Sequence, residues 1–356
     1  MDEAMNPHIG SQGLMLAEIR EQPDAVNRSL DGNSPVVARI AEEVRARGIR
    51  FVVIAARGTS DHAAIYAKYL LETTLRIPVS LAAPSVFTLY DTILDFRDTL
   101  VMGISQSGQG TDVVEVVQSA REQGSYTVGV TNFDDSPLAA AADETLLLHA
   151  GLERSVAATK TYTTSLAVLG LLVATIAKDE VLERDLRNVP DHLGAVLDLN
   201  EAIEDLSERY TYMTDCLVVA RGMNQCTAME AGLKLAETSY IISHAYSGAD
   251  LEHGPIAVVD RGFPCIMFNT EGKAHEQILS LAEKLKARGA ERLMIAHDDA
   301  SLRACRRCIR IPFRVPERVS PLVYIAAAQL FAYHLSIHRG SDPDNPRGLK
   351  KVTQTI

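Results

Sequence analysis

The feature that most constrains this 356-residue chain is an internal duplication. Short apolar, β-branched runs begin at Phe51 and at Cys216, and the second runs follow at the same spacing, at Val79 and His244. The third runs, which begin at Leu100 and Pro264, also stand at closely matching intervals. Both first runs end in Ala-Arg-Gly, at residues 56–58 and 220–222. The chain is therefore expected to contain two copies of one folding unit.

Runs of this length and composition are typical of buried parallel strands. Helix-period segments lie between them, such as residues 112–123, which end before Gly124. This alternation predicts an α/β fold in which each copy is a doubly wound, mostly parallel five-stranded sheet flanked by helices. The expected strands are residues 51–56, 79–82, 100–104, 126–130 and 145–149, and then 216–220, 244–246, 264–268, 292–296 and 308–311.

The domain organisation follows from these repeats and from a length that favours two domains. We predict an N-terminal segment at residues 1–34, a first domain at 35–185, a second domain at 186–340 and a C-terminal tail at 341–356. The polar stretch 178–205 is expected to be a linker with a bridging helix. The apolar stretch 166–177 is expected to be a buried helix.

Composition excludes several classes of function. The net charge of -11 disfavours a broad polyanion-binding face, so no nucleic-acid partner is expected and an anionic substrate would need a local site. The first residues lack the pattern of a signal peptide, and no apolar run reaches the ~20 residues that cross a bilayer, so we expect a cytoplasmic protein without a membrane partner.

The five cysteines are odd in number and lie in the second half of the chain. Cys305 and Cys308 have CxxC spacing, but they form a single pair without a nearby histidine. We therefore interpret them as two core thiols at a helix–strand junction, and we expect no metal site and no cofactor.

A polar loop follows the third strand of the first copy. It reads Ser105-Gln106-Ser107-Gly108-Gln109-Gly110-Thr111 and runs into the helix at Asp112. Hydroxyls, an amide and glycines before a helix can cradle a phosphate monoester, although such residues also serve simply as helix caps. The loop has no Walker lysine and no GxGxxG pattern, which disfavours a nucleotide. The corresponding loop of the second copy, residues 269–272, contains Glu271, so we expect one phosphate site, in the first domain.

The first strand is followed by Thr59-Ser60-Asp61-His62. Neighbouring side chains on one turn do not converge as a catalytic triad requires. Ser60 is better interpreted as a helix cap or a ligand of a sugar hydroxyl, and His62 as a packed or surface residue.

A second candidate element is the helix expected at residues 228–242. Glu230, Lys234 and Glu237 share one of its faces, which alone would fit an exposed ion-pair stripe. The alanine, glycine and leucine residues around them indicate a mostly buried helix, where charges need partners or a task. His253 follows, in front of a Gly-Pro turn that would hold it rigidly.

These motifs together resemble the sugar isomerase (SIS) family. The resemblance is to the isomerase half of glucosamine-6-phosphate synthase and, more closely, to stand-alone SIS-type glucosamine-6-phosphate deaminases. It extends from Glu18 to the end of the chain and does not include the synthase's glutaminase domain. The motifs that carry it are residues 18–23, Arg57-Gly58-Thr59-Ser60, Ser105-Gln106-Ser107-Gly108, Val156-Ala157-Ala158-Thr159-Lys160, residues 230–237, His253-Gly254-Pro255 and Leu349-Lys350-Lys351-Val352-Thr353.

The resemblance implies a role for each matching residue. Glu237 matches the carboxylate that moves a proton between C1 and C2, and Lys234 matches the lysine beside it. His253 matches a ring-opening histidine that in the synthase comes from the neighbouring subunit, and Lys351 matches the tail lysine that closes over the open-chain sugar. Phosphate and sugar contacts are implied for the matching residues Ser60, Ser105, Gln106, Ser107, Thr111 and Val156.

Two positions differ from the synthase. Gly110 stands where the synthase has a phosphate-binding threonine, so that contact passes to Thr111 or is lost. Ala158 replaces a serine near the substrate, as in the stand-alone deaminases.

The expected reaction converts glucosamine 6-phosphate and water to fructose 6-phosphate and ammonia, in a homodimer with shared active sites. The alternatives are a fructosamine-6-phosphate deglycase or another aminosugar-phosphate isomerase, and a sugar-phosphate sensor without turnover. A sensor would need a reader domain, for which the segment before Phe51 is short, and would not need Glu237.

Overall fold

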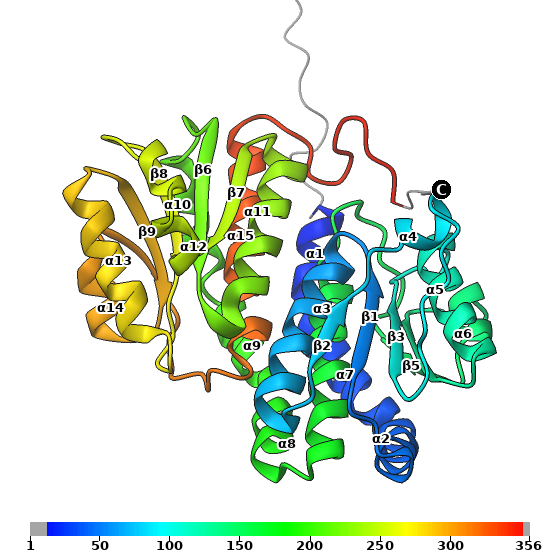
Figure 1. The fold of residues 1–356 in the computed structure, drawn as a ribbon. Helices are drawn as coiled ribbons and strands as arrows, with labels where there is room; N and C mark the ends of the chain where they lie inside the picture. The colour runs from blue at the N-terminus through cyan, green and yellow to red at the C-terminus, as the bar shows by residue number, and fades with distance from the viewer. Residues whose placement is uncertain (1–12, 352–356) are drawn as a thin grey trace, which may run out of the picture.

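Two parallel five-stranded sheets form the framework of the molecule (Figure 1). The computed structural model describes residues 13–351. The first sheet has the order β2-β1-β3-β4-β5, and all of its strands are parallel. Its strands are β1 (Val52–Ala56), β2 (Val79–Leu81), β3 (Leu100–Ile104), β4 (Tyr126–Thr131) and β5 (Glu144–Leu147).

The second sheet repeats the first. Its order is β10-β9-β8-β6-β7, again entirely parallel, and this is the first order read from the other edge. Ala56 and Ala220 end the first strands, Ile104 and Phe268 end the third, and the offset along the chain is the same for both pairs. The predicted duplication and the two α/β units are confirmed. The strands are β6 (Asp215–Ala220), β7 (Ile242–Ser247), β8 (Pro264–Phe268), β9 (Glu291–Ala296) and β10 (Arg307–Arg310).

Helices cover both faces of each sheet, as alternation along β1 shows. Val52, Ile54 and Ala56 pack with one hydrophobic cluster, whereas Val53 and Ala55 pack with another on the opposite face. In the first unit the helical elements are α1 (Leu14–Arg20), α2 (Gln22–Arg47), α3 (Thr59–Leu70), the π-helical turn η1 (Leu71–Leu75), α4 (Ser85–Thr88), α5 (Thr111–Glu122), α6 (Pro137–Ala141) and α7 (Lys160–Ala177). In the second they are α8 (Glu180–Arg187), α9 (Val189–Leu197), α10 (Asn200–Glu208), η2 (Gly222–Asn224), α11 (Gln225–Ser239), α12 (Gly248–Glu252), η3 (Pro255–Val258), α13 (His275–Ala287), α14 (Asp299–Ala304) and α15 (Ser320–His338).

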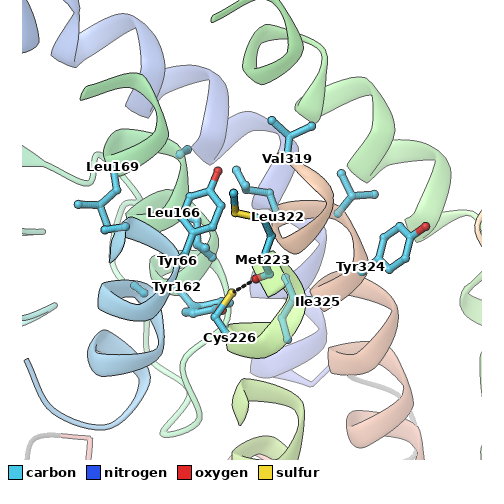
Figure 2. Close-up of a cluster of buried hydrophobic side chains, with 14 of the residues drawn as sticks. Tyr66, Tyr162, Leu166, Leu169, Met223, Cys226, Val319, Leu322, Tyr324 and Ile325 are labelled. Atoms are coloured by element: carbon cyan, nitrogen blue, oxygen red, sulfur yellow. Dashed lines mark hydrogen bonds between the residues drawn. The ribbon is translucent and has the colours of Figure 1, made fainter. Parts of the chain in front are cut away.

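One hydrophobic core joins the two units. Figure 2 shows Tyr66 of α3 and Tyr162 of α7 beside Cys226 of α11 and Leu322 of α15, all of them buried. The Cys226 thiol donates to the Met223 carbonyl oxygen, and burial raises its pKa to about 12. This cysteine is therefore a packed, unreactive side chain, and the units are fixed to each other by apolar contact.

Helices α7 and α15 are long and apolar enough to cross a membrane by composition alone. Most of each helix is buried inside the fold, as the core helices of water-soluble domains also are. The expectation of a buried helix at residues 166–177 is thus confirmed.

Several local expectations were wrong. The stretch 178–205 holds α8, α9 and most of α10 rather than a linker with one helix. The helix expected to reach residue 242 ends at Ser239, because Tyr240 adopts a left-handed conformation with φ 56° and Ile242 begins β7. Cys305 is buried but Cys308 is exposed, so only one of them is a core thiol.

The predicted domain boundaries stay predictions. Helix α2 runs unbroken through residues 34 and 35, and α8 runs through residues 185 and 186. Helices therefore continue across both of those positions.

Candidate functional site

The candidate site lies at the carboxyl ends of the first sheet's strands. The strand order reverses direction between β1 and β3, and in open parallel sheets the crevice at such a point is where ligands bind. The register pairs Ala56 with Ile104. The segment that starts at Arg57 and the polar loop that starts at Ser105 therefore leave the sheet side by side.

The polar loop has a conformation that depends on Gly108. Its φ is +63°, and a methyl group there would lie 2.2 Å from Ser136 Oγ. The Gly108 N–H donates to the Ser105 carbonyl, and the Asn132 N–H donates to the carbonyl of Gln106. Gly110 precedes α5 without giving it a side-chain cap, and in the first turn the Val113 N–H donates to Oδ1 of Asp112 at 2.9 Å.

One ion pair stands beside this loop. Asp112, in the first turn of α5, is buried, and its Oδ2 lies 2.8 Å from Nε of Arg57. The Arg57 side chain is 52% exposed, so its terminal nitrogens face solvent near the loop. The arginine neutralises a carboxylate that would otherwise repel a phosphate.

Helix α3 connects this crevice to the second unit. Thr59 Oγ1 donates to Oε1 of Glu230 at 3.1 Å, and His62 Nδ1 lies 2.7 Å from Oε2 of the same carboxylate. Glu230 is fully buried on α11. His62, interpreted from the sequence as a packed or surface residue, is packed, and its contact with Glu230 joins the two units.

Lys234 lies between two carboxylates on α11. Its Nζ is 3.2 Å from Glu230 Oε1 and 2.6 Å from Glu237 Oε2. Burial alone would lower the pKa of Lys234, but the two carboxylates raise it above its usual range. Burial likewise would raise the pKa of Glu230, yet Lys234 and the hydrogen bond with His62 hold it below its ordinary value. Glu230 and Lys234 are inaccessible, whereas the Glu237 side chain is 21% exposed, so Glu237 is the member of the stripe that a ligand can reach.

The tail brings a second lysine to the first unit. Lys351 Nζ lies 2.6 Å from Oε2 of Glu153, which is buried between β5 and α7. A little further along this segment stands the half-buried Val156. The segment is tied to the polar loop through Asn132, whose side chain bonds the carbonyl of Gly151 and the N–H of Ala150.

The structure places several of the predicted residues at the carboxyl ends of the first sheet's strands. Ser60 is the second residue of α3, and Ser105, Gln106, Ser107 and Thr111 belong to the polar loop or directly follow it. All of these except Thr111 are half-buried. Among residues 13–351 no group of His, Cys, Asp and Glu is arranged to hold a metal ion.

His253 is not part of this group. It is exposed at the end of α12 and lines a separate hollow together with Arg221, Glu252 and Lys284. No side-chain contact joins it to the stripe on α11 in the described part of the chain, so within one chain the predicted ring-opening histidine stands apart.

Sequence reasoning missed Glu153 and the Arg57–Asp112 pair. A signal for the arginine was present, because Ala-Arg-Gly ends the first strand of both units. Glu153 contacts Thr159, Thr161 and Lys351, which follow it in the chain by 6, 8 and 198 positions. No local pattern could have indicated the contact with Lys351.

Comparison with known proteins agrees with this geometry. The family model described as "SIS domain" matches residues 48–175 and 215–339, one match for each unit.

The chain belongs to the SIS domain family.

A glutamine–fructose-6-phosphate aminotransferase (isomerizing) of Thermococcus kodakarensis is 36% identical over 98% of this chain and 59% of its own length. The chain therefore spans about three fifths of the length of such relatives. Among solved structures, the C-terminal domain of glucosamine-fructose-6-phosphate aminotransferase from Francisella tularensis is 28% identical with a TM-score of 0.86, covering 95% of this chain and 99% of that one. A glucosamine-6-phosphate deaminase from Thermotoga maritima shares the fold, at 23% identity and a TM-score of 0.77, covering 96% and 100%.

These findings support an isomerase-type SIS protein of phosphorylated sugars. The Francisella tularensis match is to a C-terminal domain, and the family model matches both units of this chain.

Proposed function

We propose that this protein is a glucosamine-6-phosphate deaminase that converts glucosamine 6-phosphate and water to fructose 6-phosphate and ammonia. The observation that carries the proposal is the buried stripe on α11. It leaves one accessible carboxylate, Glu237, ion-paired with Lys234 on a helix that packs against α3. Helix α3 starts at the same end of the first sheet as the polar loop, which suits a phosphate monoester. Proton abstraction next to a carbonyl or imine needs such a positioned base with a cation nearby.

The proposed chemistry begins with opening of the sugar ring. Glu237 then takes the proton from C2 while the aldehyde oxygen at C1 gains a proton from water, giving an enolamine. Glu237 returns its proton to C1 and the amino nitrogen loses a proton to water, so that C1 becomes the CH2OH carbon of a C2 ketimine. Water adds to C2, and the C–N bond breaks to release ammonia and leave the ketone of fructose 6-phosphate. The buried ammonium of Lys234 keeps a positive charge beside Glu237 while the proton moves.

Substrate binding is assigned to the first unit. The phosphate would be held by the loop from Ser105 to Ser107, by Thr111 and by the open start of α5, and the sugar by Ser60 and Val156. Lys351 would lie over the open-chain sugar, since the tail crosses from the second unit to the segment that contains Val156.

The proposal includes a homodimer, because His253 lies apart from the stripe within one chain. The partner subunit's His253 would open the ring. This can be tested by mixing the inactive variants Glu237→Gln and His253→Asn, because a mixed dimer then contains one site with both intact residues. Each mixed dimer should recover up to about half of the activity of a wild-type dimer, and no recovery would contradict a shared site. A cytoplasmic location remains a prediction.

The deciding experiment measures ammonia release from glucosamine 6-phosphate by the full chain. Glu237→Gln should lower kcat by about 100-fold to 10,000-fold, the usual contribution of a general base. Glu283→Gln is the matched control, because Glu283 forms an i,i+3 pair with Lys286 on the exposed face of α13. Cleavage of a fructosamine 6-phosphate without deamination would move the function to deglycation, and inactivity toward both compounds would favour a sensor.

A further inference from the structure

The tail reaches the first unit through a carboxylate that has no part in the chemistry described above. Glu153 is fully buried, and its Oε1 accepts the backbone N–H groups of Thr159 at 2.9 Å and Thr161 at 3.1 Å. Its Oε2 accepts the Thr161 hydroxyl at 2.7 Å and the Lys351 ammonium at 2.6 Å. One oxygen is thus fixed to the start of α7, while the other is aimed at the tail.

A buried carboxylate is costly unless a cation compensates it. Lys351 does so, and the pKa of Glu153 lies below its ordinary value although burial acts to raise it. A carboxylate of α1 that contacts the same segment shows the contrast. Glu18 accepts the N–H groups of Arg154 and Ser155, but burial raises its pKa. The charge on Glu153 and the docking of Lys351 therefore support each other.

Two further contacts place the tail before it reaches Glu153. The Asp344 carboxylate accepts the N–H groups of Leu14 and Met15, each at 2.7 Å, at the start of α1. The Arg347 N–H donates to the Tyr240 hydroxyl, and its guanidinium lies 3.9 Å from the centre of that ring. Tyr240 directly follows the helix that carries Glu237. The tail is therefore held on both sides of the crevice, and Glu153 is its last described anchor.

We propose that Glu153 is a positioning residue that docks the tail and orients the Lys351 ammonium over the sugar site. The inference rests on the proposed function for the role of Lys351, but the docking itself is a separate physical statement. The Lys351 side chain remains 24% exposed, so part of it stays accessible while it is paired with Glu153. A closed tail would hold that amine at a fixed place and exclude water from the open-chain sugar.

The first test follows docking without any substrate. Trypsin cleavage after Arg347 reports release of the tail and can be followed by intact mass. Glu153→Gln and Lys351→Gln should each speed this cleavage by about tenfold or more, because each removes a charge-assisted hydrogen bond. Lys350→Gln is the control, since this neighbouring lysine is exposed and makes no contact in the described part of the chain. Wild-type cleavage rates in folded Glu153→Gln would overturn the proposal. Should that variant fail to fold, the rate in Lys351→Gln decides in the same way.

The second test asks whether Glu153 acts through Lys351. In ammonia release, Glu153→Gln should lower kcat no more than Lys351→Gln, the double variant should equal Lys351→Gln, and Glu153→Asp should restore part of the activity. Full additivity of the two changes would overturn a positioning role. Absence of ammonia release in the wild type would refute the proposed function, while the cleavage assay would still decide the docking.

Discussion

The two units share one fold but differ in what stands at the point where their strand order reverses. In the first unit the loop from Ser105 to Gly110 is open to the crevice, and its nearby carboxylate, Asp112, is paired with Arg57. In the second unit the equivalent place holds a carboxylate of the protein itself. Glu317 Oε2 accepts the Lys273 N–H at 3.2 Å, and a methyl group on Gly272 would lie 2.3 Å from that oxygen.

This difference shows how two copies of one fold come to differ at equivalent loops. Gly108 and Gly272 stand at the same distance beyond the ends of β3 and β8, so the two loops are counterparts. In one loop the donors at a helix start are left for a ligand, and in the other an internal anion lies against them. Glu153 and Glu317 are counterparts at the same offset, each between the last strand of its unit and the following long helix. Lys351 pairs with the first, while the second reaches the loop.

The largest expected effect concerns the contact between the equivalent helices α3 and α11. Glu230→Gln should lower the free energy of unfolding by about 3–5 kcal/mol, because it leaves Lys234 and His62 without their buried partner. Glu144→Gln, which breaks the surface pair with Arg39, should cost about 0–1 kcal/mol. Denaturant titrations of both variants measure this, and equal losses would contradict it.

The same variant carries a pH prediction. The pKa of Glu230 is lowered in the folded state, so its stabilising contribution is present above its ordinary value of 4.5 and is lost as the pH falls through the folded value. The stability difference between wild type and Glu230→Gln should therefore be constant from pH 7 to 5 and shrink below pH 4.5. A difference that does not change with pH would show that the carboxylate's charge is unimportant.

A matched glycine pair tests the two loops directly. Gly108→Ala forces a left-handed alanine against Ser136 and should weaken sugar-phosphate affinity by about 10-fold to 100-fold, as strain of about 1–3 kcal/mol implies. Gly272→Ala needs only the flexible end of Glu317 to move, so affinity should change less than about twofold. Calorimetric titration with glucosamine 6-phosphate measures both, and equal losses would remove the functional difference between the loops.

Removing the Glu317 carboxylate should let the second loop bind phosphate as well. Glu317 shares a hollow of about 360 Å³ with Arg221, Gly222 and Lys273. In Glu317→Ala we expect inorganic phosphate to bind a second site per chain with a roughly millimolar Kd. Glu271→Ala is the control, because Glu271 is exposed and pairs with Arg314. Unchanged stoichiometry in Glu317→Ala would show that this carboxylate is not what closes the second loop.

The smallest expected effect concerns the arginine beside the first loop. Arg57→Gln should raise the KM for the sugar phosphate by about tenfold, the value of one charged hydrogen bond. Arg39→Gln is matched in exposure, at 55% against 52%, and should change nothing. Adding Asp112→Asn to Arg57→Gln separates two causes. A KM that returns toward the wild-type value indicates that Arg57 mainly neutralises Asp112, whereas a KM that stays raised indicates a direct contact between Arg57 and the phosphate. An unchanged KM in Arg57→Gln would contradict both.

Much of the fold could be predicted because strands and repeats produce recognisable local patterns in the sequence. Apolar runs located every strand to within a few residues, and the repeated spacing predicted two equal units. The end of α11 could not be predicted, since nothing in Ser239-Tyr240-Ile241 signals that a tyrosine will adopt a left-handed conformation.

The site was partly predictable for the same reason. The polar loop and the Glu230–Lys234–Glu237 stripe are contiguous or helically spaced, so the sequence displays them. The contacts of His62 with Glu230, Lys351 with Glu153 and Lys273 with Glu317 join residues 168, 198 and 44 positions apart. Glu271 of the second loop pairs with Arg314, and Glu317, which sequence reasoning did not single out, also lies at that loop. The expectation that this loop binds no phosphate stays a prediction.

The three helices between residues 180 and 208 have a consequence for motion. Helix α9 packs against both α2 and α15, α10 packs against α15, and α8 packs against α7. The connection between the units is thus interleaved with both of them, and it offers no hinge about which one unit could swing away from the other. We therefore expect the proposed site to open through short elements at its rim, chiefly the tail that follows α15, while the two sheets stay in place.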